Sequence, residues 1–538
     1  MRIPRVGLVA VTAIAVAALG LIGTDELTHR SRLPSFAEQI CGVDSTWMRL
    51  IERGIYDGRN GDIIFLPDTP IYFSGGGSGW SHSGPWPYLQ HVPVVFYGPG
   101  RIRAGVEVGE PTTIADVAPT IAALMKGVVA ADGRVLTQVA PLGGKLIRRA
   151  SPRLILTVVL DGAGWNVLDR WPDAWPTLRM MMNKGISYSN AMVGSSPSVT
   201  PAVHTTLGTG RFPATHGITS IPVRDDVGNV VDPFYEGASS ALIEIPTVAE
   251  LWDQQNDERA LIGMVGHVPW HLGMIGKGAE APGADKDHAA WLDLDTNEWI
   301  TNPDHYELPE GFEEQSDLPG RLTALDESDG TKDGLWKEVP LDDPDRIEEL
   351  PAFAQHHVDK LIKFMSAARY GGDDVTDLLF TNFKQIDLLG HIFNMESTQV
   401  RDALVAGDAA LTELIDYLDS SMARGDYVVI VTADHGQQPD QRALDSYGID
   451  SDEMTADIER EFGPVVADIS PTELFLDLDA LALSGYTVDD VARFVGDYRI
   501  RDNATTFGIQ SFGSGRYAHG DRVMEMAVPS RVLTPNDC

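Results

Sequence analysis

Acidic and histidine side chains follow three apolar runs of this sequence. Asp161 comes directly after RLILTVVL, and the pair Asp434 and His435 follows YVVIVTA. A third run, DLLFTNF, leads within four residues to Asp387, and His391 stands four residues further on. A spacing of four puts a carboxylate and an imidazole on one face of a helix, where together they are ligands for a divalent metal. The sequence therefore suggests metal-assisted chemistry.

A hydroxyl stands in a suitable place to take part. In the stretch SPSVTPAVHTTLGTGRFPATHGI, Thr200 precedes Pro201. Because Pro favours the first helical position and Thr is a good N-cap, we expect Thr200 to cap the start of a helix, where free N–H groups attract anions. Taken singly, a helix cap, an Asp-His pair and an i, i+4 pair are usually structural. The prediction of metal-assisted chemistry therefore rests on their occurrence together.

The elements that position these residues have an α/β rhythm. Five apolar, β-branched runs are predicted to be buried strands of a parallel sheet, at 92–98, 153–160, 260–266, 377–383 and 427–433. Helical patterns at 351–369 and 397–423 separate some of them. Since ligands bind beyond the carboxyl ends of the strands in open α/β sheets, such a sheet would gather the three aspartates at one edge.

Composition excludes one large class of function. The chain has 538 residues, 43% hydrophobic content and a formal net charge of −37. It is therefore large enough for a substantial core, and its acidic surface lacks the basic footprint of a nucleic-acid binder. We expect a small-molecule or lipid-like substrate and no nucleic-acid partner. The oligomeric state cannot be read from the sequence.

Three segments differ from the rest. Residues 1–30 carry Arg2 and Arg5 before an uncharged run, which predicts an export signal, either a cleaved signal peptide or an uncleaved membrane anchor. The main body is then extracytoplasmic, secreted or membrane-anchored. Residues 127–150 are predicted to connect the N-terminal segment to the main sheet. Residues 276–350, acidic and rich in Pro and Gly, are predicted to be an insertion over the edge or mouth of the sheet.

The motifs taken in order resemble the alkaline phosphatase superfamily, and within it the nucleotide pyrophosphatase/type I phosphodiesterase branch. The matching blocks are Asp161, Thr200 with His204, Thr209-Gly210, Pro213 to Ile218, Asp387 with His391, and Asp434-His435-Gly436. The resemblance implies an α/β, three-layer sandwich with a mostly parallel central sheet. It also implies a main catalytic domain over 151–538 that contains the acidic insertion.

The resemblance further implies two divalent metal ions, with Thr200 as the catalytic nucleophile. Asp161, Thr200, Asp434 and His435 would hold one metal, and Asp387 and His391 would hold the second with one more histidine. Zinc is the expected ion for a set without cysteine, and manganese or another divalent ion also suits it.

Two histidines compete for the last ligand position. His519 lies downstream of the other blocks, as the family order requires. The stretch around His82 and His91, SHSGPWPYLQHVPVVFYGPG, resembles the family's closing segment but stands near the front of the chain. We therefore predict a circular permutation in which residues 41–126 complete the sheet, with His82 as the preferred ligand.

The resemblance implies an exported phosphoric-ester hydrolase, most simply a phosphodiesterase. A phosphomonoesterase, a lipid head-group phosphotransferase and a non-catalytic cell-surface binding protein on the same fold are the alternatives. One position departs from the pattern: Ile221 stands where the branch usually has an Asn whose amide donates to a phosphate oxygen. Ser220 and Arg224 are candidate substitutes for that donor. No Cys-x-Pro-x-Arg motif of the sulfatase type is present.

The two cysteines, Cys41 and Cys538, yield a first prediction. If the front segment is permuted, the present C-terminus lies near residue 41, and an extracytoplasmic protein would join the pair in a disulfide. The bond would stabilise the fold by about 2–4 kcal/mol. Non-reducing peptide mapping of the secreted protein should recover a Cys41 to Cys538 cross-link, whereas two free thiols would contradict the prediction.

Overall fold

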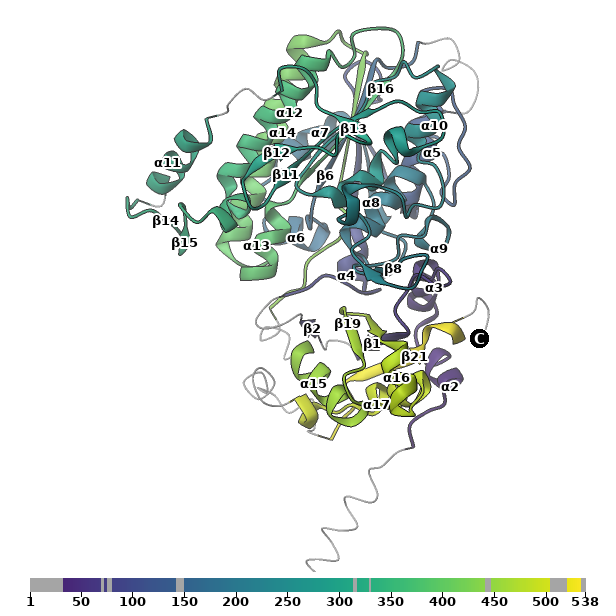
Figure 1. Ribbon diagram of the computed structural model, residues 1–538. Coiled ribbons are helices and arrows are strands. Elements are labelled where there is room, and N and C mark those ends of the chain that lie inside the picture. Colours follow the sequence, from purple (N-terminus) through teal and green to yellow (C-terminus); the bar gives the residue numbers. More distant parts are fainter. Residues whose placement is uncertain are drawn as a thin grey trace, which may run out of the picture.

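The protein is built around two β-sheets of very different size (Figure 1). The computed structural model describes residues 32–68, 72–74, 80–141, 150–312, 317–328, 330–440, 447–503 and 520–533. The strands of the large sheet follow in the order β12 (Glu298–Ile300), β11 (Asp287–Asp293), β10 (Ile262–Gly266), β16 (Asp377–Phe383), β6 (Leu154–Leu160), β17 (Tyr427–Thr432), β3 (His91–Tyr97), β7 (Ile186–Met192) and β4 (Val106–Val108). Short strands β13 (Tyr306–Glu307) and β5 (Thr112–Thr113) pair with β11 and β7.

The centre of this sheet is parallel, as predicted. Strand β6 lies between β16 and β17 and runs parallel to both, with Thr157 opposite Phe380 and Ile430. All residues of the three strands are buried. These β-branched and leucine-rich runs can be covered on both faces because none of them alternates with polar residues. The carboxyl ends of the three strands consequently meet at one edge.

Helices cover both faces of the large sheet and give three layers (Figure 1). On one face lie α6 (Trp165–Arg170), α7 (Pro176–Lys184), α12 (Pro351–Ala368), α13 (Gln385–Phe393) and α14 (Thr398–Ser421). On the other lie α5 (Val117–Leu124), α8 (Thr200–Thr209) and α10 (Val248–Gln255), with the 3-10 segment η3 (Pro269–Met274) packed on α8. The α/β class and the three-layer architecture expected from the sequence are confirmed.

The direction of one strand was predicted wrongly. Strand β3, expected among the parallel strands, runs antiparallel to both β17 and β7. Its apolar residues are buried like those of the parallel strands. An apolar run reports burial on both faces and carries no information on chain direction, so the sequence pattern could not reveal the difference.

The segment 276–350 is only partly peripheral. It contains β11, which pairs in parallel with β10 and so extends the large sheet, as well as β12 and β13 at that edge. Beyond them lie α11 (Leu318–Ser328) and the small hairpin of β14 (Leu335–Trp336) and β15 (Val339–Pro340). The sequence of β11, DHAAWLD, has charged ends and two alanines, which explains why it did not stand out as a buried strand.

Segments from both ends of the chain form the second sheet. Its antiparallel order is β19 (Val466–Ile469), β20 (Glu473–Leu476), β1 (Ile63–Pro67) and β21 (Met524–Pro529), with α15 (Ser451–Phe462), α16 (Leu478–Ser484) and α17 (Val488–Asp497) in the same lobe (Figure 1). The sequence predicts one catalytic domain over 151–538, with the whole of 41–126 completing its sheet. In the structure β1 and β19 to β21 pair in the smaller sheet, and their side chains pack in hydrophobic clusters separate from that of the large sheet.

The remaining described elements are short. They comprise α2 (Phe36–Ile40), α3 (Ser45–Gly54), α4 (Pro87–Gln90), α9 (Pro213–His216), the strand pair β2 (Tyr72–Ser74) and β18 (Gly448–Asp450), the hairpin of β8 (Val223–Arg224) and β9 (Val230–Val231), and several 3-10 turns. Helix α4 leads directly into β3, so residues 80–97 run from a loop through a short helix into the large sheet.

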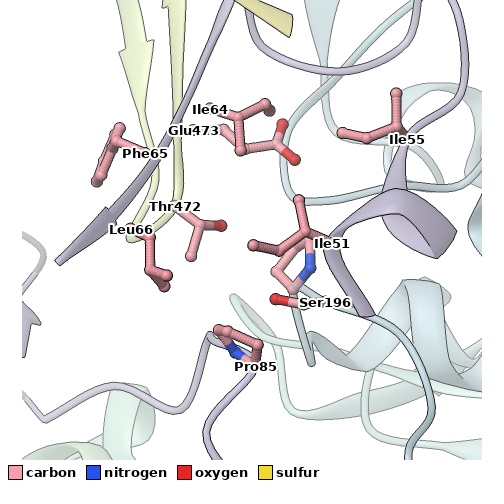
Figure 2. Close-up of a pocket in the computed structure, with 10 residues that line it drawn as sticks. Ile51, Ile55, Ile64, Phe65, Leu66, Pro85, Ser196, Thr472 and Glu473 are labelled. Carbon is pink, nitrogen blue, oxygen red and sulfur yellow. The ribbon is translucent and has the colours of Figure 1, made fainter. Parts of the chain in front are cut away.

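A small cavity lies at the seam where the second sheet meets α3 and the loops at Pro85 and Ser196 (Figure 2). The Glu473 carboxylate, from β20, accepts hydrogen bonds from Asn60 Nδ2 and from the N–H of Gly61, both at 2.9 Å. Burial raises the pKa of Glu473 to about 7. On the opposite wall the N–H of Ser196 donates to the carbonyl of Leu50 at 2.9 Å. None of the predicted site residues lines this cavity. The hydrogen bond between Ser196 and Leu50 nevertheless holds the loop that leads to Thr200.

The two described ends of the chain lie close together. Leu533 packs in the same hydrophobic cluster as Ile40 and Val43, and the N–H of Ala527 donates to Gln39 Oε1 at 2.9 Å. This closeness is what the permutation requires, and the permutation itself stays a prediction. Cys538 and the export segment 1–30 lie outside the described residues. Among the helices that the structure describes, none combines the length and apolarity needed to span a bilayer.

Close packing of α8 on η3 leads to a stability prediction. A Cβ added at Gly208 would lie 2.4 Å from the carbonyl oxygen of Gly273 and 2.8 Å from that of Met274. Gly208→Ala should therefore lower the free energy of unfolding by about 1–3 kcal/mol, because backbone must move. Gly407→Ala in α14 is the control, since the nearest atom would lie 3.8 Å away, and it should gain up to about 1 kcal/mol. Equal changes of the two variants in urea denaturation would contradict the inference that α8 packs closely on η3.

Candidate metal centre and nucleophile

Three buried aspartates meet at the carboxyl edge of the large sheet. Asp161 follows β6, Asp434 follows β17, and Asp387 lies in the first turn of α13, just after β16. Their exposed fractions are 0%, 1% and 1%. Because these strands are adjacent and parallel, three residues separated by up to 273 positions come to one place, as the sequence predicted.

Two histidines flank Asp387 in the first group of candidate ligands. His82 Nε2 lies 3.5 Å from Asp387 Oδ1, and His391 Nε2 lies 3.4 Å from Asp387 Oδ2. The ligand atoms of these three residues lie within 4.8 Å of one another. The structure thus brings His82 from the front segment to the pair on α13. His519, the alternative, lies outside the described residues.

Asp161, Asp434 and His435 form the second group. His435 Nε2 lies 3.4 Å from Asp161 Oδ1 and 3.5 Å from Asp434 Oδ2. All three of these atoms are buried and lack a hydrogen-bond partner. Their second carboxylate oxygens are engaged: Asp161 Oδ2 accepts from Asn382 Nδ2 at 2.9 Å, and Asp434 Oδ1 accepts from the N–H of Gly162 at 3.1 Å. Unpartnered donor atoms that converge in this way fit a divalent cation.

The histidine rings are oriented as ligands would be. Nδ1 of His82 faces the carbonyl of Ser198 at 3.0 Å, Nδ1 of His435 faces that of Gly436 at 3.0 Å, and Nδ1 of His391 faces that of Trp80. A carbonyl can only accept, so each Nδ1 donates, and when a ring is neutral its lone pair lies on Nε2, towards the carboxylates. A backbone carbonyl behind the ring is the usual support of a metal-binding histidine.

Ionisation in the second group also favours a bound cation. Burial and the nearby Asp161 carboxylate raise the pKa of Asp434 to about 7. Burial by itself lowers the pKa of His435, but the carboxylates of Asp434, Asp161 and Asp387 outweigh it and raise this pKa to about 9. The metal-free group therefore holds protons at neutral pH that a divalent cation would displace.

Thr200 is the first residue of α8 but does not cap it. The N-cap is Val199, with no side-chain capping bond, and Pro201 follows as expected. The expectation that the Thr200 side chain is the cap was wrong by one position. The hydroxyl instead accepts a hydrogen bond from Lys384 Nζ, which lies 3.0 Å from Thr200 Oγ1. Thr200 is 2% exposed, and the ammonium that its hydroxyl contacts also contacts Asp161 and Asp387.

Lys384 is the residue that the sequence analysis missed. Its ammonium donates to Asp161 Oδ2 at 2.9 Å, to Asp387 Oδ2 at 2.8 Å and to Thr200 Oγ1 at 3.0 Å. Burial lowers the pKa of Lys384, but the three aspartates outweigh burial and raise it above its usual value. Its position at the carboxyl end of a predicted strand, three residues before Asp387, was the signal available in the sequence.

Three further side chains surround the centre. His204 Nε2 is buried without a hydrogen-bond partner 3.6 Å from Asp434 Oδ2, and its Nδ1 lies 3.0 Å from Nδ1 of His271. Gln437 Nε2 donates to Asp387 Oδ1 at 2.8 Å. His204 belonged to the motif without an assigned role. His271 lies in η3 and Gln437 in the loop after β17, so no sequence spacing linked them to it.

The motif after the nucleophile has a structural part. His216 Nε2 lies 3.0 Å from Thr206 Oγ1, which ties α9 to α8. The Ile221 side chain supplies no donor. Arg224 does not substitute for one, since its guanidinium donates to Asp62, just before β1, at 2.6 Å and to the carbonyl of Leu476 in β20 at 2.7 Å. The Ser220 hydroxyl is buried without a hydrogen-bond partner.

Known proteins are similar to this chain in sequence and in fold. Residues 155–487 match the type I phosphodiesterase/nucleotide pyrophosphatase family, a range that contains every predicted site residue except His82. Alkaline phosphatase PafA from Elizabethkingia meningoseptica is 24% identical over 408 residues, which cover 64% of this chain and 72% of that protein. Alkaline phosphatase PhoV from Synechococcus elongatus is 23% identical over 335 residues, covering 53% and 59%.

A solved structure agrees at the level of the fold. The crystal structure of wild-type alkaline phosphatase PafA superimposes with a TM-score of 0.52 and 21% identity, over 64% of this chain and 76% of that one. Similarity of this degree identifies the fold as alkaline phosphatase-like, in agreement with the sequence analysis, and leaves the activity to be argued from the site.

The metal-binding prediction separates the two competing histidines. His82→Ala should lower the metal content of the purified protein by about one equivalent per chain, because an open group with two remaining ligands binds weakly. His519→Ala is the matched variant and should leave the content unchanged. Elemental analysis by mass spectrometry measures both, and the reverse pattern would assign the ligand to His519.

Proposed function

Since the chain belongs to the type I phosphodiesterase/nucleotide pyrophosphatase family, we propose that it is a metal-dependent hydrolase of phosphoric esters. Thr200 is the nucleophile. One divalent cation is held by Asp161, Thr200, Asp434 and His435, and a second by Asp387, His391 and His82. Zinc suits these ligands, and manganese or another divalent ion is the alternative.

The observation that carries this proposal is the placement of the Thr200 hydroxyl. It is buried at the N-terminal end of α8, uses none of its hydrogen-bonding capacity on the helix, and lies one hydrogen bond from an ammonium that also contacts Asp161 and Asp387. The nucleophile is therefore linked through one ammonium to a carboxylate of each ligand group, at a helix end where a phosphate is favoured.

The chain's own residues allow a two-step displacement. Thr200 Oγ forms a bond to phosphorus while the bond from phosphorus to the alcohol oxygen breaks, and the hydroxyl proton ends on the released alcohol. Water then cleaves the phosphothreonyl bond and restores the hydroxyl, so one water is consumed in each cycle. Bound divalent cations would supply the positive charge that makes a threonine hydroxyl nucleophilic and offsets the charge of the leaving oxygen.

Substrate and location extend the proposal. The substrate is a small or lipid-like phosphoric ester, because the acidic surface disfavours a polyanion. The export segment at 1–30 supports an extracytoplasmic site of action. The presence of all seven candidate ligands argues against the non-catalytic binding protein considered as an alternative. The amide donor that would support the phosphodiester preference expected from the sequence is absent, because Ile221 occupies its position.

Thr200 gives the direct test of this mechanism. Thr200→Ala should lower kcat on bis-p-nitrophenyl phosphate and p-nitrophenyl phosphate by at least about 10³-fold, because the attacking atom is lost. Thr200→Ser should retain part of the activity, and both variants should keep their melting temperature. Wild-type rates in the alanine variant would refute the assignment of the nucleophile.

A further inference from the structure

Lys384 stands between β16 and α13, at the carboxyl edge where the site lies. It is the N-cap residue of α13, one helical turn before Asp387, and its side chain is 3% exposed. The ammonium also lies 6.0 Å from the centre of the Trp270 ring. Burial of a flexible cationic side chain is costly, so its partners indicate what it does.

All three of its polar partners belong to the proposed reaction centre. One carboxylate comes from each ligand group, Asp161 at 2.9 Å and Asp387 at 2.8 Å, and the third partner is the nucleophile oxygen of Thr200 at 3.0 Å. An ion pair with a purely structural role would need only the carboxylates. The third contact puts the ammonium beside the atom that attacks phosphorus.

Lys384 and a metal use different atoms of Asp161. The lysine contacts Oδ2, while Oδ1, together with Asp434 Oδ2 and His435 Nε2, has no hydrogen-bond partner. The ammonium therefore leaves the donor atoms of that group available, and the two kinds of cation need not exclude each other there.

These contacts set the place of a substrate. Phosphorus must come close to Thr200 Oγ in line for attack, and a donor 3.0 Å from that oxygen is then within reach of a non-bridging phosphoryl oxygen. On the proposed function, we propose that Lys384 is a further catalytic residue, which binds this oxygen and makes the site prefer dianionic phosphate monoesters over monoanionic diesters.

Charge is the reason for that preference. Lys384 carries a full positive charge into the site, whereas the isoleucine at position 221 offers no side-chain donor. Hydrogen bonds from an ionised donor are about twice as strong as neutral ones, and the gain rises with the charge on the acceptor. A terminal phosphoryl group carries more negative charge than a diester and gains more from the ammonium.

The experiment compares neutral variants of the full-length, zinc-loaded protein. Lys384→Met removes charge and donors, and Lys384→Gln removes the charge but keeps donors for the two carboxylates. Lys360→Met is the matched control, because Lys360 is also a buried lysine and lies on α12, outside the proposed centre. The measurements are kcat/KM for p-nitrophenyl phosphate and bis-p-nitrophenyl phosphate, inorganic phosphate binding by calorimetry, and metal content.

Both Lys384 variants should lose about 100-fold in kcat/KM on the monoester and no more than about tenfold on the diester. Inorganic phosphate should bind about tenfold more weakly, with metal content unchanged, and Lys360→Met should match the wild type. Equal losses on both esters would overturn the preference, and unchanged phosphate affinity would overturn the contact. If metal content falls in Lys384→Met, and both metal content and activity are restored in Lys384→Gln, then Lys384 supports the site structurally and does not act in catalysis.

Failure of the proposed function would look different. In that case the zinc-loaded wild-type protein hydrolyses neither ester, and only the phosphate-binding measurement tests whether Lys384 contacts phosphate. Tighter phosphate binding by the wild type than by Lys384→Gln would then uphold the contact without the activity, and equal binding would overturn it. If Lys384→Met does not fold, Lys384→Gln decides by the same criteria.

Discussion

Burial of three carboxylates at one edge of a sheet is the constraint on which the rest of the structure depends. Asp161, Asp387 and Asp434 are almost fully shielded from water, and charges removed from water in this way are tolerated only when cations and hydrogen-bond donors surround them. Lys384 supplies one cation, and the convergent unpartnered atoms of Asp161, Asp434 and His435 are suited to another. The buried carboxylates therefore require nearby cations, and the proposed reaction uses the same positive charge.

The scaffold gathers these groups because parallel strands end at the same edge. β6 lies between β16 and β17, so each aspartate follows its strand into the same space. α8 brings Thr200 to this space, and the loop before α4 brings His82. Adjacent parallel strands thus make a polar cluster from residues that are hundreds of positions apart, and rigid elements hold it in place.

The second sheet joins segments near the two described ends of the chain and holds the loop before the nucleophile. β1 from the front pairs with β20 and β21 from the back, and the seam holds the loop that contains Ser196, four residues before Thr200. Its strands are short and its residues belong to two distant segments, so a linear pattern could not join them. A front segment divided between two sheets is compatible with the predicted permutation, which would bring β3 to the large sheet from near the front of the chain.

The sequence by itself determined the apolar strands, the main helices and the motif residues from Asp161 to His435, because burial periodicity and motif spacing are local properties. Only the tertiary structure decided the direction of β3 and the membership of β11 in the sheet, and it placed His82, the ligand that the resemblance favoured, beside Asp387. It alone also revealed Lys384 against Thr200. The physical reason is the same in each case: strand pairing and side-chain contact between distant segments are set by packing of the whole chain, which a local pattern does not encode.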